Sequence, residues 1–111
     1  MKDCVDNVVF DGFGWDKGRN GAIFVTFPRT VFSWTMTIDF DSDVKQFQVW
    51  NGHTKKLDDG SFEIRDKGWN GDVDAGDTLE LGFQIRFDNN GGPPPNIRAI
   101  SLGSDYVCGL E

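Results

Sequence analysis

The chain has 111 residues, and its 18 acidic and 11 basic side chains give a net charge of −7 at pH 7. This length suits one domain with its own hydrophobic core, and the negative charge opposes binding to nucleic acid or to an anionic membrane. No segment approaches the roughly 20 consecutive apolar residues of a membrane-spanning helix. We therefore expect a single domain over residues 1–111 and an electrically neutral partner.

Short runs of alternating apolar and polar residues fill the chain between Asn-Gly and Asp-Gly pairs, which favour tight turns between strands. In chain order, the alternation predicts strands at residues 8–10, 20–27, 31–40, 44–50, 62–64, 78–87 and 97–102. No helical periodicity extends beyond two turns. The prediction is an all-β fold, an antiparallel β-sandwich of the jelly-roll or immunoglobulin-like kind.

The two longest runs predict which side chains form the core, because every second residue of a strand points to the same face. In residues 31–40, the apolar face holds Phe32, Trp34, Met36, Ile38 and Phe40. In residues 78–87, the apolar face holds Leu79, Leu81, Phe83, Ile85 and Phe87, and the opposite face holds Glu80, Gly82, Gln84 and Arg86. We expect the two apolar faces to pack against each other.

The run at residues 44–50 carries an aromatic residue in the polar phase. Phe47 and Val49 are its natural core pair. Gln46, Gln48 and Trp50 then lie on the opposite face, toward water. The packing of the core does not explain why Trp50 lies on the face toward water, which indicates a binding role.

Cys4 and Cys108 lie almost at the two ends of the chain. Because the termini of a compact domain often lie close together, we predict a disulfide between them; the alternative is two unpaired buried thiols. A disulfide across so long a loop stabilises by about 4–5 kcal/mol in the chain-entropy model. It also indicates an oxidising compartment, so we expect a secreted, extracellular protein.

Four tryptophans exceed what the packing of so short a chain requires. Trp34 is in phase with core residues, whereas Trp15 and Trp69 fall in glycine-rich turns and Trp50 faces water. A flat indole covers the apolar C–H face of a β-1,4-linked pyranose, and neighbouring amides can bond the hydroxyls. The hypothesis is a polysaccharide-binding surface; the alternative is that these three indoles cap the ends of the sandwich.

The sequence also resembles the family 2 carbohydrate-binding modules, in matching segments that keep the family's order along the whole chain. These segments are Cys4, Ser33-Trp34-Thr35-Met36-Thr37, Gln48-Val49-Trp50-Asn51, Trp69-Asn70-Gly71, Ala75-Gly76, Leu81-Gly82-Phe83 and Cys108. The resemblance implies a β-sandwich that binds cellulose or chitin, with a disulfide joining its ends. It also implies a surface platform made of Trp15, Trp50 and Trp69.

By the same resemblance, Gln48 and Gln84 fall where the family carries amides that contact sugar. Glu80 falls at a polar position of the family, where a carboxylate is a departure. The loop after Trp15 is about two residues longer than usual, so the family's asparagine on the next strand would fall near Ile23. The predicted carbohydrate-binding residues are Trp15, Gln48, Trp50, Asn51, Trp69, Asn70, Glu80 and Gln84.

Acidic runs at residues 39–43 and 72–77 resemble fragments of calcium loops but lack the EF-hand spacing. We expect no catalytic site, metal or other cofactor, and leave a structural calcium open. The expected partner is an insoluble polysaccharide: cellulose first, chitin next, xylan as a further option. The expected context is a monomer within a larger secreted enzyme, a glycoside hydrolase. The alternatives are a protein-interaction or matrix β-sandwich that uses the tryptophans for a protein partner, and a calcium-dependent lectin.

Overall fold

The computed structural model describes residues 4, 7–10, 17–88, 94–103 and 105–109. Nine strands form within them: β1 Val8–Phe10, β2 Gly18–Thr26, β3 Thr35–Phe40, β4 Gln46–Val49, β5 His53–Lys56, β6 Phe62–Arg65, β7 Thr78–Arg86, β8 Ile97–Leu102 and β9 Asp105–Gly109. These described residues contain no helix long and apolar enough to cross a membrane.

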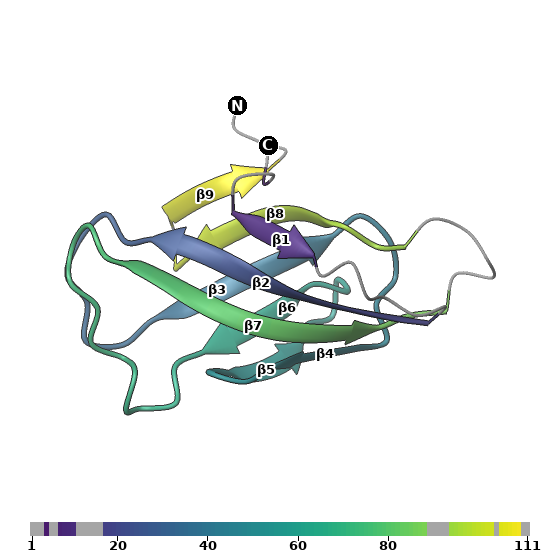
Figure 1. The fold of residues 1–111 in the computed structure, drawn as a ribbon, viewed down its shortest axis with the longest axis horizontal. Coiled ribbons are helices and arrows are strands. Elements are labelled where there is room, and N and C mark those ends of the chain that lie inside the picture. The colour runs from purple at the N-terminus through teal and green to yellow at the C-terminus, as the bar shows by residue number, and fades with distance from the viewer. Residues whose placement is uncertain (1–3, 5–6, 11–16, 89–93, 104, 110–111) are drawn as a thin grey trace.

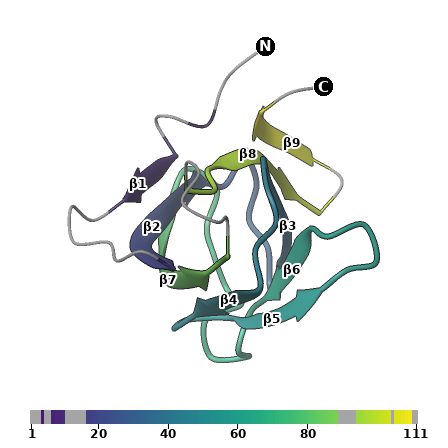
Figure 2. The same cartoon turned by 90° about the vertical axis from the view of Figure 1, so that its right-hand side faces the viewer.

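The strands form two antiparallel sheets packed face to face, which confirms the predicted sandwich (Figures 1 and 2). We call the sheet with the order β1-β2-β7-β4 the front sheet, and the sheet with the order β5-β6-β3-β8-β9 the back sheet. Hydrogen bonds join the two sheets along one side. There the Thr54 hydroxyl of β5 donates to the Phe47 carbonyl oxygen (2.9 Å), and the Lys56 ammonium donates to the Val44 carbonyl oxygen (3.1 Å). The inner faces of both sheets hold the core.

Phenylalanine rings fill much of the space between the sheets. Phe47 of the front sheet lies 5.4 Å from Phe40 and 5.3 Å from Phe62 of the back sheet, between ring centroids, and 5.6 Å from Phe83 beside it. Such edge-on and tilted pairs add about 0.5–1.5 kcal/mol each to the gain from burial. The predicted core faces of residues 44–50 and 78–87 are confirmed, with Leu79 only partly buried.

The prediction that Phe32 packs in the core is wrong, because its side chain is 82% exposed. β3 begins only at Thr35, and the preceding residues form the connection from the front sheet to the back sheet. Val31 anchors this connection through a pair of backbone hydrogen bonds with Val73 (2.9 and 3.0 Å). The chain bends between Val31 and the buried Trp34, so the period of two does not continue through Phe32.

Two strands were not predicted from the sequence. β5 consists of polar residues at the edge of the back sheet, and therefore has no apolar alternation. β9 pairs with β8 at the other edge. Both strands owe their structure to pairing with a neighbouring strand.

The disulfide between Cys4 and Cys108 is present, with the two Cα atoms 5.1 Å apart, which confirms that prediction. Cys108 lies in β9 of the back sheet, and Cys4 precedes β1 of the front sheet. The Asn7 N–H donates to the Cys4 carbonyl oxygen at 3.0 Å. The bond thus links the N-terminal segment of one sheet to an edge strand of the other.

Candidate functional site

The outer face of the front sheet carries an apolar row that runs across all four of its strands. Residues opposite each other in an antiparallel pair share a face, and Val9, Ala22 and Gly82 are aligned in this way on β1, β2 and β7. Trp50 directly follows β4 and completes the row, because its backbone N–H donates to the Gly82 carbonyl oxygen at 3.2 Å. The row ends in the exposed indole.

Gly82 makes room for the Trp50 ring. A Cβ atom added at Gly82 would lie 3.5 Å from Trp50 Cε3, so the indole lies over the strand at the point where no side chain projects. The Trp50 side chain is nevertheless 54% exposed, as the strand phase predicted. The indole therefore packs on the sheet at Gly82 and still leaves a broad apolar surface available to a ligand.

A row of amide side chains lies beside the apolar row on the same face, two residues away along each strand. Asn20 on β2 is aligned with Gln84 on β7, and Gln84 with Gln48 on β4. The two glutamines were predicted from the sequence, whereas Asn20 was not. Ile23, near which the family's asparagine would fall, is fully buried in the core, so it offers no contact to a sugar. The alternation of β2 carries the missed signal, because Asn20 is in phase with the outward-facing Ala22.

Trp69 lies in the connection between β6 and β7, and its side chain is 73% exposed. The next residue, Asn70, ties this turn to the turn that carries Trp50, because Asn70 Nδ2 donates to the Asn51 carbonyl oxygen at 2.7 Å. Asn70 Oδ1 in turn accepts a hydrogen bond from the Lys67 N–H at 2.8 Å. One side chain thus holds together the two turns that bear the exposed indoles.

The buried Trp34 supports the same turn from below. Its Nε1–H donates to the Asn70 carbonyl oxygen at 2.9 Å, and its backbone N–H donates to Asp66 Oδ1 at 2.9 Å. Asp66 Oδ2 accepts a further hydrogen bond from the Gly68 N–H at 3.0 Å. Gly68 has a φ of 89°, which favours glycine over residues with a side chain. Trp34 is therefore a core residue, as predicted, and also a support for Trp69.

The other predicted residues lie as follows. Glu80 is exposed on the outer face of β7, opposite the half-buried Phe24 of β2. Asn51 is half-buried, and its carbonyl oxygen receives the bond from Asn70. Each polar atom of the Asn70 amide already has a protein partner, so this side chain acts first to position its neighbours. Trp15 lies outside the described residues.

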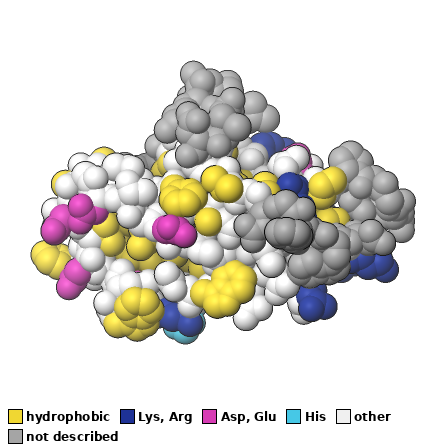
Figure 3. All heavy atoms as spheres, viewed as in Figure 1, with side chains coloured by type: hydrophobic (Ala, Val, Ile, Leu, Met, Phe, Trp, Pro, Cys, Tyr) yellow, Lys and Arg dark blue, Asp and Glu magenta, His cyan; other side chains and the backbone are white. Residues whose placement is uncertain are grey.

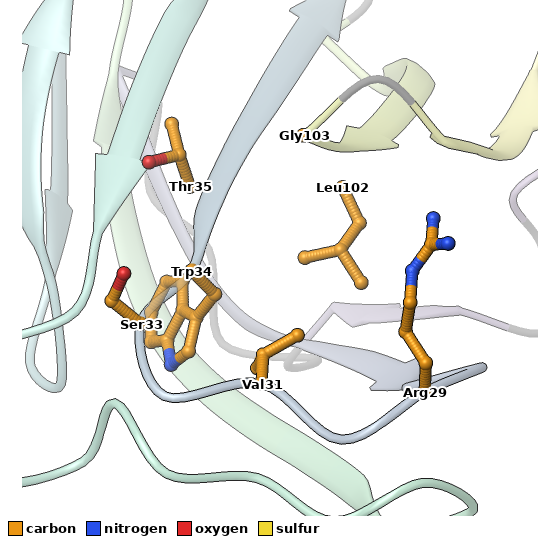
Figure 4. Close-up of a pocket in the computed structure, with 7 residues that line it drawn as sticks. All are labelled: Arg29, Val31, Ser33, Trp34, Thr35, Leu102 and Gly103. Atoms are coloured by element: carbon orange, nitrogen blue, oxygen red, sulfur yellow. The ribbon is translucent and has the colours of Figure 1, made fainter.

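Figure 3 shows this outer face in space-filling form, with separate hydrophobic patches among polar groups. A hollow of about 300 Å³ lies elsewhere, between the β2–β3 connection and the β8–β9 turn. Val31 and Leu102 point toward each other across it, with Trp34 beside them (Figure 4). Within the described part of the chain, no three acidic, histidine or cysteine side chains are grouped so that they could hold a metal ion.

The role of Asn70 as a tie between the two turns leads to a prediction. In Asn70→Asp, a carboxylate oxygen replaces Nδ2, so the bond to the Asn51 carbonyl is lost while the acceptor for the Lys67 N–H remains. We expect the free energy of unfolding to fall by about 1–3 kcal/mol, measured by urea denaturation. Asn51→Asp is the matched control, since it leaves the Asn51 carbonyl in place; we expect a change within about 0.5 kcal/mol. Equal losses in both variants would contradict this role.

The fold is similar to several solved structures. The chitin-binding domain of Chi18aC from Streptomyces coelicolor aligns with a TM-score of 0.62 and 22% identity, covering 95% of this chain and 96% of that one. Chitinase ChiA74 from Bacillus thuringiensis aligns with a TM-score of 0.64 and 18% identity over 87% of this chain, which spans 15% of the chitinase. ChBD2 from Thermococcus kodakarensis KOD1 aligns with a TM-score of 0.52 and 18% identity, covering 99% of this chain and 95% of that one. No curated protein matches the chain by sequence.

The two antiparallel sheets of this chain, which has exposed indoles beside one of them, form the same kind of sandwich as these solved structures. Residues 9–101 match the family model described as cellulose binding domain. The chain belongs to that family, the family 2 carbohydrate-binding modules, as its motifs indicated.

Proposed function

We propose that this module binds an insoluble β-1,4-linked glycan, chitin or cellulose, on the outer face of the front sheet. The observation that carries the proposal is the pair of exposed indoles, Trp50 and Trp69, whose turns are joined by the Asn70–Asn51 hydrogen bond. Two turns held together in this way lose little conformational freedom on binding, which favours stacking of their indoles on a rigid polymer. The family description supports cellulose, and the names of the structural relatives support chitin.

The amide row supplies the polar part of the proposed site. Gln48 and Gln84 each offer a hydrogen-bond donor and an acceptor beside the apolar row, and sugar hydroxyls require both. Asn20 Oδ1 is buried, so that residue can offer only its Nδ2 group. Trp15 joins the platform by family resemblance alone. Asn51 stays a predicted contact, and Asn70 acts mainly as the support of the two turns.

We also propose that the module is secreted and attached to a glycoside hydrolase, which it concentrates on the solid substrate. The disulfide supports an oxidising compartment. The alignment with a short part of a much longer chitinase supports the attachment. Residues 1–111 would then be one domain of a longer protein.

The test is depletion of the protein from solution by washed chitin, microcrystalline cellulose and insoluble xylan, each with and without EDTA. We expect retention on chitin, cellulose or both, unchanged by EDTA, from a protein that is monomeric by size-exclusion chromatography with light scattering. No retention on any of the three solids, together with a dimer in solution, would favour a protein-interaction sandwich instead. Loss of retention in EDTA would indicate a calcium-dependent lectin.

A further inference from the structure

The proposed binding face carries one carboxylate close to an exposed indole. Glu80 and Gly82 are successive outward-facing residues of β7, and the Trp50 ring lies over Gly82. Two such residues are about 7 Å apart along a strand. Opposite Glu80 lies the half-buried Phe24. A sugar stacked on the Trp50 indole would therefore place its neighbouring substituents within reach of the Glu80 carboxylate.

Glu80 differs from carboxylates on the back sheet in having no cationic partner. Glu63 pairs with Arg65 (2.8 Å, Oε1 to Nε), and Asp39 pairs with Arg98 (2.6 Å, Oδ2 to Nη2). Glu80 forms neither an ion pair nor a side-chain hydrogen bond with any residue that the structure describes. Its charge is thus available to a ligand.

The surrounding charge reinforces that of Glu80. Exposed acids at Asp72, Asp74 and Asp77 lie in the segment that leads into β7. Figure 3 shows acidic side chains in the half of this face where β7 begins, and most of the basic ones toward the other end. The whole protein has a net charge of −7, so the electrostatic field over this half of the face attracts a cationic polymer and has no net effect on a neutral one.

We propose, on the basis of the function above, that Glu80 makes the face selective for glycans that carry free amino groups. The ligand class is partially deacetylated chitin, whose glucosamine units are ammonium ions in mildly acidic solution. The carboxylate accepts a charge-assisted hydrogen bond from an ammonium group, whereas the acetamide of intact chitin and the hydroxyl of cellulose form only the weaker neutral bond. Glu80 is then a specificity-determining residue within an aromatic site.

The experiment measures binding isotherms on two insoluble chitins of equal surface area, one fully acetylated and one partially deacetylated, in mildly acidic, low-salt buffer. We expect the wild-type protein to bind the deacetylated polymer up to about 5-fold more tightly, the range of an exposed ion pair. In Glu80→Gln we expect most of this preference to be lost, so that the ratio of the two affinities falls toward 1. In about 1 M NaCl, where the Debye length is roughly 3 Å, the wild-type ratio falls likewise.

Glu63→Gln is the matched control, because it removes the same charge from the back sheet. If the position of the charge matters, Glu63→Gln keeps the wild-type ratio of affinities. If Glu63→Gln lowers the ratio as much as Glu80→Gln does, only the net charge matters, and the proposal is overturned. A wild-type ratio of 1 would also overturn it and leave polysaccharide binding intact. No retention on either chitin or on cellulose would instead refute the proposed function, and the role of Glu80 with it.

Discussion

Replacement of both Trp50 and Trp69 by alanine is expected to abolish retention on the insoluble glycan. Truncating a central aromatic anchor of an interface costs about 2 kcal/mol or more, roughly 30-fold in Kd. The two side chains are 54% and 73% exposed, so their removal takes away contact area for the ligand and little of the core. We expect each single variant to bind roughly 30-fold more weakly and the double variant roughly 1,000-fold, if the losses add.

The measurement is a depletion isotherm for each variant, with urea denaturation to show that folding is intact. Lys55→Ala is the control, because Lys55 is an exposed side chain of β5 in the back sheet, away from the two rows and from the Trp69 turn. We expect it to bind like the parent. Binding of the double variant within about 3-fold of the parent would rule out stacking on these two indoles, since a single anchor accounts for more than that.

The second large effect concerns stability. Loss of the Cys4–Cys108 bond, by reduction or by substitution of both cysteines with serine, is expected to lower the free energy of unfolding by about 4–5 kcal/mol. The two cysteines are 104 residues apart in sequence, so the bond restricts almost the entire unfolded chain. Domains of this size are stable by only about 5–15 kcal/mol, and the reduced protein would therefore be marginally folded.

Urea denaturation with and without reductant measures this effect. Trp34→Ala in the oxidised protein is a useful comparison, because it removes a buried side chain, costs about 3–5 kcal/mol and leaves the bond intact. Reduction that shifts stability by less than about 1 kcal/mol would show that the unfolded chain is already compact without the bond. Binding of the folded, oxidised protein should not respond to traces of reductant too weak to open the bond.

The proposed site divides into parts that the sequence could predict and parts that it could not. The strand phase alone separates the buried Trp34 from the exposed Trp50, because alternation determines the face on which a side chain lies. The same alternation placed Gln48 and Gln84 on the outer face, and the family resemblance implied their role as sugar contacts. Asn20 was in phase as well, but a correspondence based on loop length pointed instead to the buried Ile23.

The hydrogen bonds that support the Trp69 turn could not be predicted from sequence patterns. The hydrogen bonds of Asn70 to Asn51 and of Trp34 to Asn70 join residues that are 19 and 36 positions apart. No local periodicity predicts which distant backbone group an amide will meet. Asn70 therefore looked like a sugar contact, although the structure engages both its polar atoms within the protein.

Residue patterns were enough to predict the all-β class, the inward and outward faces of the longest strands, the exposure of Trp50 and the disulfide. These follow from a period of two and from the placement of two cysteines at the ends of the chain. Packing between distant segments was needed to show that Phe32 lies outside the core, that the polar segment β5 is a strand, and that the turns of Trp50 and Trp69 are joined. Each of these depends on pairing or bonding between segments far apart in sequence, whose free energy exists only once the two sheets have packed together.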